Sequence, residues 1–298
     1  MPRVREVLAC ISRSSGGVAR GDREADEIRA ALASAGMAAR VELLEGGVIV
    51  GLAQQSAADG AKLIIVGGGD GSISAAAGVL AGTSTKLGIL PLGTRNHFAR
   101  DLGIPMKLDE AAKLIASGKS RKVDVADVNG RVFLNNSAIG LYPLMVIDRD
   151  LQRERLGRSK RLAMLIASAR TLARFDHHRL ILTVNEEKER VDTPLLFVGN
   201  NDYRLDLRAP GRRESLDDGK LCVFVMRKKT RGGLIAASIR ALFGRTREND
   251  MVKLENVERL RVTSRRRHLP VSIDGEVAEL RPPFDYKARK RALNVITP

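Results

Sequence analysis

The first 125 residues alternate between short apolar runs and amphipathic segments. Runs rich in β-branched residues predict strands, and apolar residues spaced by three or four positions predict helices. The predicted strands are Val4–Ile11, Ala39–Leu44, Leu63–Val66 and Leu87–Leu90, and the predicted helices are Asp22–Ala35, Val48–Asp59, Ser72–Leu80 and Asp109–Ser117. This alternation is typical of a parallel sheet with helices on both faces.

After about residue 121 strand-like segments follow one another with few helices between them. They are Val123–Val128, Arg131–Asn136, Leu180–Val184, Thr193–Gly199, Lys220–Met226, Val257–Thr263 and Pro270–Ile273. Helical periodicity returns in Ser159–Phe175 and Gly232–Phe243. The pattern predicts an antiparallel β domain.

The predicted fold class is therefore α/β plus all-β, in two domains. The α/β domain covers residues 1–122 and the β domain residues 123–287. The apolar segment Leu293–Ile296 reads as a strand that returns to the first domain, so we join residues 288–298 to it.

Composition narrows the class of protein. The chain has 298 residues, of which 44% are apolar, and this suffices for two cores. It lacks an uncharged apolar run long enough for a transmembrane helix. Arg3, Arg5 and Glu6 do not fit a signal peptide, so we expect a cytoplasmic protein. Cys10 and Cys222 lie in apolar runs and are expected to be buried free thiols, with a disulfide as the alternative.

The net charge of +16 is concentrated in the second half of the chain. Residues 1–125 hold 16 basic and 13 acidic residues, whereas residues 126–298 hold 35 and 22. This asymmetry indicates an anionic partner. Aromatic residues make up only 3%, which leaves few stacking platforms for nucleic acid. We therefore expect an anionic membrane surface, met peripherally, and no nucleic acid; Arg265-Arg266-Arg267 would add to such a basic surface.

The strand Leu63–Val66 runs directly into Gly67-Gly68-Gly69-Asp70-Gly71-Ser72. Glycines allow a sharp turn and a close approach to a ligand, and the N-terminus of the following helix favours an anion. Asp70 adds a carboxylate that can help hold a metal. A plain βα connection needs fewer glycines, so the sequence predicts a phosphate-binding turn.

A second polar turn, Pro91-Leu92-Gly93-Thr94-Arg95-Asn96, follows the next strand. Thr94 and Asn96 can donate hydrogen bonds to a phosphate or a purine. Alone, this segment is an ordinary loop. Because the carboxyl ends of parallel strands meet at one edge of the sheet, the two turns together predict a two-sided nucleotide site.

These motifs resemble the diacylglycerol kinase catalytic family, which includes bacterial soluble diacylglycerol kinases and YegS-like lipid kinases. The resemblance rests on GGGDGS (67–72) and PLGTRNHFARDLGIP (91–105), and continues through FLNNSAIGLYP (133–143), FVGNNDY (197–203), ESLDDGKL (214–221) and SIDGE (272–276). It implies a Rossmann-like ATP-binding domain, related to those of phosphofructokinase and NAD kinase, followed by a β-sandwich lipid-substrate domain. It also implies transfer of the γ-phosphate of ATP to a lipid hydroxyl, and is compatible with a homodimer.

Asp274 and Glu276 stand two positions apart in Ser272-Ile273-Asp274-Gly275-Glu276. On a regular strand they would share a face; the alternative is a hairpin Asp-Gly turn beside a solvated Glu. The resemblance implies that Glu276 acts as general base on the lipid hydroxyl, with Asp274 as its rival or its partner.

Leu216-Asp217-Asp218-Gly219-Lys220 is another acidic turn, which alone reads as solvated. The resemblance implies a structural Mg²⁺ held by Asp218 and by the carbonyls of Ser215 and Lys220. A second, catalytic Mg²⁺ would arrive with ATP near Asp70. The alternatives are a kinase for a soluble acceptor, as in NAD kinase, and a lipid- or nucleotide-sensing module without catalytic activity.

Overall fold

The computed structural model describes residues 7–15, 18–19, 21–144, 146–148, 166, 177–203, 213, 215–227, 230, 232–233 and 250–298. The chain forms two compact units. One comprises Met1–Val125 together with Arg289–Pro298, and the other comprises Ala126–Ala288. These limits lie within three residues of the predicted ones.

The first unit is built on a parallel sheet, as the alternating pattern predicts. Its strands run in the order β6 (Lys86–Pro91), β5 (Leu63–Gly68), β1 (Val7–Ser12) and β4 (Ala39–Leu44). The end of β18 (Phe284–Thr297) pairs in parallel with β6, with Asn294 opposite Lys86. A chain segment from the far end of the sequence thus extends this sheet.

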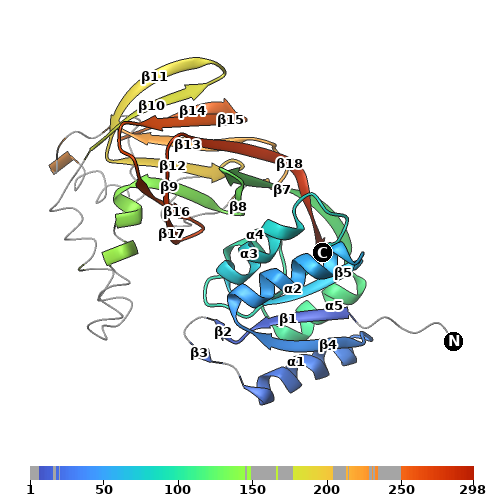
Figure 1. The fold of residues 1–298 in the computed structure, drawn as a ribbon. Coiled ribbons are helices and arrows are strands. Elements are labelled where there is room, and N and C mark those ends of the chain that lie inside the picture. Colours follow the sequence, from blue (N-terminus) through green and yellow to red (C-terminus); the bar gives the residue numbers. More distant parts are fainter. Residues whose placement is uncertain are drawn as a thin grey trace. The chain divides into compact units, whose positions relative to one another are not determined.

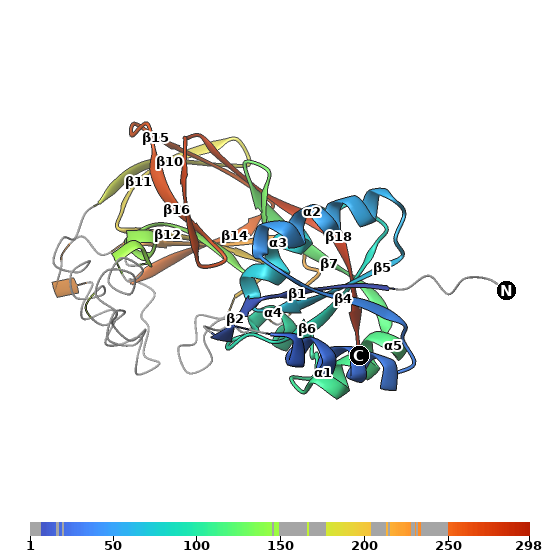
Figure 2. The ribbon, with the colours of Figure 1, turned by 60° about the horizontal axis from the view of Figure 1, so that its bottom comes forward.

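Helices cover both faces of the parallel sheet. In Figures 1 and 2, α1 (Asp22–Ser34) and α5 (Leu108–Ser117) lie on one side, and α2 (Gly46–Ala58) and α3 (Asp70–Leu80) lie on the other. Helix α1 buries Ile28 and Leu32, four positions apart, as an amphipathic helix does. The structure adds a short helix, α4 (His97–Asp101), and a small hairpin of β2 (Ser14–Ser15) and β3 (Val18–Ala19).

The second unit is an antiparallel β-sandwich. One sheet has the order β14 (Met251–Val257), β13 (Leu221–Met226), β12 (Leu195–Asn200), β9 (Asn136–Gly140), β16 (Leu269–Ile273) and β17 (Glu276–Leu280). The other contains β11 (Glu187–Thr193), β10 (His178–Val184), β15 (Arg259–Ser264) and β18, and β7 (Lys119–Val128) pairs with both β18 and β8 (Arg131–Phe133).

The core of the sandwich draws on both sheets. Ile139, Val198 and Val223 from one sheet pack in a single cluster with Leu182 and Tyr286 from the other. The Tyr286 hydroxyl lies 3.1 Å from Ser137 Oγ, and burial raises the pKa of Tyr286. The predicted fold class, α/β followed by an antiparallel β-sandwich, is confirmed.

Several predicted elements differ from the structure at strands with little apolar pattern. The predicted strand Thr193–Gly199 corresponds to β12 alone, since Thr193 ends β11 and Pro194 separates the two strands. Strands β11, β14 and β17 were not predicted. The predicted helices Ser159–Phe175 and Gly232–Phe243 lie outside the described residues, apart from Ile166, Gly232 and Gly233.

Both cysteines are free and buried, which confirms the prediction of buried thiols. Burial raises the pKa of the Cys10 thiol to about 11 and that of the Cys222 thiol to about 12. Within the described residues, none of the helices has the length and apolar character needed to cross a membrane.

Candidate active site

The glycine-rich turn connects β5 to α3. The helix begins at Asp70, two residues before the predicted start, and Gly69 is its N-cap. The first backbone hydrogen bond of the helix runs from the Ile73 N–H to the Gly69 carbonyl, 3.1 Å away. A glycine cap has no side chain that could accept hydrogen bonds from the amides of the first turn that follows it. The first-turn amides of Asp70, Gly71 and Ser72 are therefore suited to an anion, and binding of a phosphate there stays a prediction.

Two glycines of this turn stand where the protein's own packing would crowd a Cβ. A Cβ on Gly67 would lie 2.6 Å from Cδ1 of Ile11 and 2.9 Å from Cδ1 of Leu92. A Cβ on Gly68 would lie 2.8 Å from Cβ of Ser72. The glycine run thus serves close contact between strand, turn and helix, in addition to the close approach to a ligand that the sequence predicts.

The loop Pro91–Asn96 contacts the glycine turn, as two neighbouring strand ends should. The Leu92 N–H donates to the Gly68 carbonyl at 3.0 Å. A Cβ on Gly93 would lie 2.4 Å from Cα of Gly69, so only glycine fits there. Thr94 is exposed beside this contact. The structure therefore brings the two halves of the predicted nucleotide site together.

Asn96 takes a different part from the predicted one. It is buried, with a left-handed φ of 52°. Its Nδ2 donates to the carbonyls of Pro91 and Gly93 at 3.1 and 2.8 Å, and its Oδ1 accepts the Gly93 N–H at 3.0 Å. The amide that we expected to bind nucleotide is thus engaged within its own loop.

Asp70 lies where the turn, α3 and α4 meet. One oxygen of its carboxylate accepts the Phe98 N–H, from the start of α4, at 3.4 Å. This contact connects the carboxylate to the second loop, because α4 directly follows that loop.

The two carboxylates of the SIDGE segment do not lie on one regular strand. Asp274 and Gly275 both have positive φ, 48° and 88°, and form a two-residue turn between β16 and β17. Positive φ at both positions is the type I′ geometry that suits a tight hairpin. The expectation of a shared strand face is wrong, and the hairpin alternative describes the backbone.

The structure separates the surroundings of Asp274 and Glu276. The Asp274 carboxylate accepts the backbone N–H groups of Leu134, Asn135 and Asn136 at 2.8, 2.8 and 3.0 Å. Its own N–H donates to the Asn136 carbonyl at 2.8 Å. Glu276, opposite Ile273 in the hairpin, is exposed.

Asp218, Ser215 and Lys220 line one cavity of about 440 Å³, so the structure brings the three predicted Mg²⁺ ligands together. Within the described part of the chain, no cluster of three or more His, Cys, Asp or Glu side chains fits a metal. The predicted site uses only one carboxylate. This suits Mg²⁺, which proteins bind through one or two carboxylates together with several water molecules. The Lys220 carbonyl already accepts the Asn201 N–H at 2.9 Å, which leaves its second lone pair for a cation.

The same cavity is lined by charged residues that the sequence analysis did not single out. Lys253 Nζ pairs with Asp202 Oδ1 at 2.5 Å. Burial alone would raise the pKa of Asp202, but hydrogen bonds from Lys253 and Cys222 outweigh it and hold that pKa below its ordinary value. Lys253 belongs to β14, a strand that the apolar pattern does not predict.

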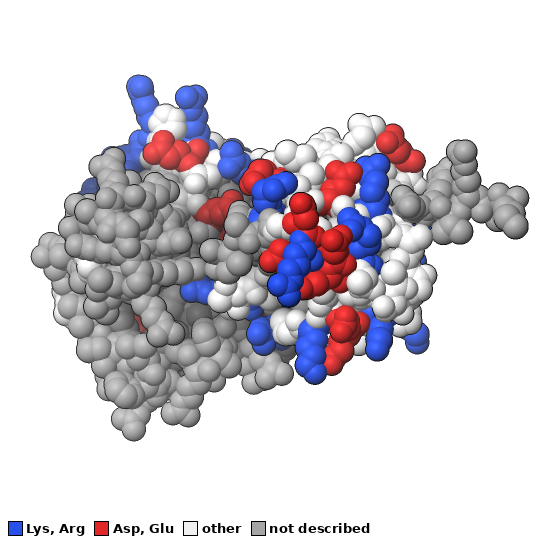
Figure 3. Space-filling model, turned by 90° about the horizontal axis from the view of Figure 1, so that it is seen from below, with Lys and Arg blue, Asp and Glu red and all other residues white. Residues whose placement is uncertain are grey.

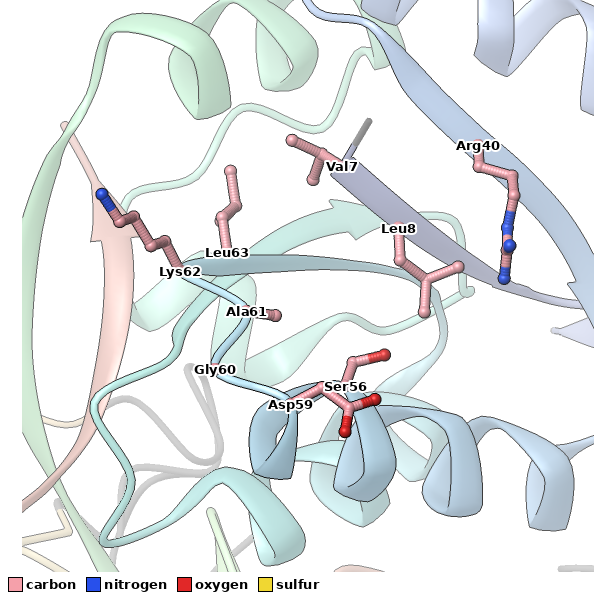
Figure 4. A pocket seen from close by; sticks show the side chains of 9 residues that line it. All are labelled: Val7, Leu8, Arg40, Ser56, Asp59, Gly60, Ala61, Lys62 and Leu63. Atoms are coloured by element: carbon pink, nitrogen blue, oxygen red, sulfur yellow. The ribbon is translucent and has the colours of Figure 1, made fainter. Parts of the chain in front are cut away.

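A second cavity, of about 580 Å³, lies at the opposite end of the parallel strands from the two loops. Figure 4 shows Leu8 and Leu63, near the starts of β1 and β5, above Ser56 and Asp59 at the end of α2. Arg40 projects from β4 at its side. None of the predicted site residues lines this cavity.

Comparison with known families assigns both units. Residues 7–128 match the diacylglycerol kinase catalytic domain, and residues 146–297 match the YegS C-terminal NAD kinase beta sandwich-like domain. The chain thus combines the two domain types that these family models describe, one in each unit. The chain belongs to the diacylglycerol kinase catalytic family.

Individual relatives agree with this assignment. The chain is 29% identical to the uncharacterized protein sll0036 of Synechocystis sp. over 82% of its own length and 57% of that protein's. It is 44% identical to the "Probable lipid kinase YegS-like" of Citrobacter koseri over 27% of its length and 28% of that protein's. The matched part therefore spans less than two thirds of the length of either relative.

Among solved structures, a proposed diacylglycerol kinase of Bacillus anthracis superposes with a TM-score of 0.76 at 27% identity. The superposition covers 98% of this chain and 97% of that one. The similarity thus extends over both units.

Proposed function

We propose that this protein is an ATP-dependent lipid kinase that transfers the γ-phosphate to the hydroxyl of a diacylglycerol-like or ceramide-like acceptor. The observation that carries the proposal is the pair of interlocked loops, which presents the uncapped amides of α3 beside the Asp70 carboxylate and the exposed Thr94. Helix amides and a hydroxyl bind phosphate oxygens well. An acceptor with an aliphatic tail is supported by membership of a lipid kinase family.

In this proposal the first-turn amides and Thr94 hold the phosphates of ATP, and Asp70 helps to order the Mg²⁺ that arrives with it. That Mg²⁺ would neutralise charge on the phosphates during transfer. Phosphoryl transfer needs position and charge more than covalent chemistry, so a rigid pair of loops is suited to it.

The acceptor hydroxyl must lose its proton as the phosphate is transferred. We assign this proton to Glu276, whose carboxylate is exposed. Asp274 is the weaker candidate, because accepting a proton would disturb its three hydrogen bonds to backbone amides. We therefore regard Asp274 as the residue that fixes the turn from which Glu276 projects.

The test is transfer of labelled phosphate from ATP and Mg²⁺ to diacylglycerol, ceramide and NAD, the lipids in mixed micelles. We expect a labelled lipid, and a loss of about 100-fold or more in kcat for Glu276→Gln, the range for removal of a general base. Glu279→Gln is the matched control, since Glu279 is an exposed glutamate on the same strand, β17. Labelled NAD alone would identify a soluble-acceptor kinase. ATP binding without any transfer would identify a sensing module.

We also propose that Mg²⁺ binds at Asp218 with the carbonyls of Ser215 and Lys220. Binding to the folded state alone stabilises it, by about 2.7 kcal/mol when Mg²⁺ is at 100 times its Kd. Millimolar Mg²⁺ should therefore raise the Tm of the native chain, and of Asp217→Asn, but not of Asp218→Asn. An equal rise in all three would refute the site. The comparison needs no enzymatic activity.

A further inference from the structure

Asn96 holds the second loop of the active site from a buried position. Its side chain is only 4% exposed and makes three hydrogen bonds to the loop Pro91–Gly93. Both amide hydrogens are engaged by carbonyls, and the oxygen accepts an N–H. Asparagine tolerates the left-handed φ of this position better than most residues.

Gly93, which Asn96 holds, is the point at which the second loop meets the glycine turn. The missing Cβ of Gly93 lets Gly69 approach, since that Cβ would lie 2.4 Å from Gly69 Cα and 2.7 Å from Asn96 Oδ1. Gly69 is the N-cap of α3. The position of Gly93 therefore fixes where the first-turn amides of α3 stand.

Asn96 also connects to Asp70 through α4. The backbone carbonyl of Asn96 accepts the Arg100 N–H at 3.0 Å and so makes the first hydrogen bond of that helix. The Phe98 N–H of the same helix reaches the Asp70 carboxylate. One buried residue thus connects the amides of α3, through its side chain, with the Asp70 carboxylate, through its backbone carbonyl.

We infer that Asn96 is a positioning residue of the nucleotide site and not a nucleotide ligand: it braces the two loops in the geometry that binds phosphate before any nucleotide arrives. The inference rests on the proposed function in one respect, that the loops bind ATP. It replaces the prediction of a direct contact from this side chain.

The test compares Asn96→Gly with Asn129→Gly. Asn129 has nearly the same backbone, with φ 49°, and a similar brace in the other unit, donating to the Pro283 carbonyl at 3.1 Å and accepting the Asp285 N–H at 2.8 Å. Glycine keeps the left-handed backbone in both variants and removes only the side chain. Two readouts are needed: amide hydrogen exchange of residues 91–96 without nucleotide, and the Kd for MgATP by calorimetry.

In Asn96→Gly we expect faster exchange at Leu92 and Gly93 without nucleotide, together with a Kd raised about tenfold or more, since buried hydrogen bonds of this kind are worth roughly that factor. Asn129→Gly should change neither quantity. Gly93→Ala serves as the second variant, because it keeps residue 96 as asparagine but presses a Cβ against Gly69 and the Asn96 side chain. Its Kd should rise as well.

Two outcomes would overturn the inference. A raised Kd with unchanged exchange in the nucleotide-free chain would make Asn96 a ligand. Faster exchange with an unchanged Kd would make it a residue of the fold alone. If the native chain binds no ATP, the proposed function fails, and the exchange data still report separately whether the brace exists.

Discussion

At the scale of single residues, the β16–β17 turn divides two tasks between two neighbouring carboxylates. Asp274 is tied to three consecutive amides, whereas Glu276 is exposed. The amides belong to residues 134–136, about 140 positions earlier in the chain, and no local sequence pattern predicts such a distant contact. The sequence therefore predicted that both carboxylates matter, but not which of them the backbone holds.

Asp274→Asn should destabilise the sandwich unit without removing the turn. Asparagine tolerates the positive φ, but its NH₂ group would face backbone donors in place of an acceptor oxygen. Leaving part-buried amides without a partner costs about 1–3 kcal/mol. Urea unfolding should show this loss for Asp274→Asn and almost none for Glu276→Gln. Equal losses in the two variants would contradict the division of tasks.

At the scale of elements, the two loops of the proposed nucleotide site were predictable because their sequence signals are local. Glycine runs at strand ends and the alternation of strand and helix are read within a few residues. The strands that the sequence pattern did not predict also share a cause. Strands β11, β14 and β17 lie at sheet edges and carry charged residues, so they lack the apolar alternation on which prediction depends.

Two glycine substitutions in the same unit should have opposite effects. Gly67→Ala would press a Cβ against Ile11 and Leu92, and overpacking of this kind destabilises by about 1–3 kcal/mol. Gly51, exposed in the middle of α2, has nothing within 4 Å of its missing Cβ. Gly51→Ala should therefore stabilise by about 0.5–1 kcal/mol. Urea midpoints measure both, and destabilisation by Gly51→Ala would argue against the α2 geometry.

At the scale of the whole molecule, the charge is uneven. On the face shown in Figure 3, Lys and Arg are interspersed with Asp and Glu over much of the described surface. The excess of 13 positive charges belongs to residues 126–298. In this part of the chain an exposed turn between β15 and β16 consists of Arg265, Arg266 and Arg267. Arg281 lies beside the turn, where its Nε donates a hydrogen bond to His268 Nε2 at 2.9 Å.

We propose that this arginine turn contributes to binding an anionic membrane. Vesicles containing phosphatidylglycerol should sediment the native chain, less so as salt rises, and phosphatidylcholine vesicles should not. Changing Arg265, Arg266 and Arg267 to serine should weaken sedimentation several-fold, by roughly 1 kcal/mol per charge at most. Changing Lys119, Arg121 and Lys122 of β7 removes the same charge and is the control. An equal loss of sedimentation in both variants would show that net charge alone causes the binding, and this would contradict the proposal.

The path of β18 has a consequence for how the protein is made. The first unit lacks the strand beside β6 until residues 289–298 have been synthesised, although β1, β4, β5 and β6 come from the first 91 residues. During translation the edge of β6 that later pairs with β18 therefore stays unpaired while the whole sandwich unit is synthesised. Contacts between such distant parts of a chain form slowly, and open strand edges invite aggregation. We expect the nascent chain to depend on chaperones over this interval. The cause of this dependence is the order of the strands along the chain.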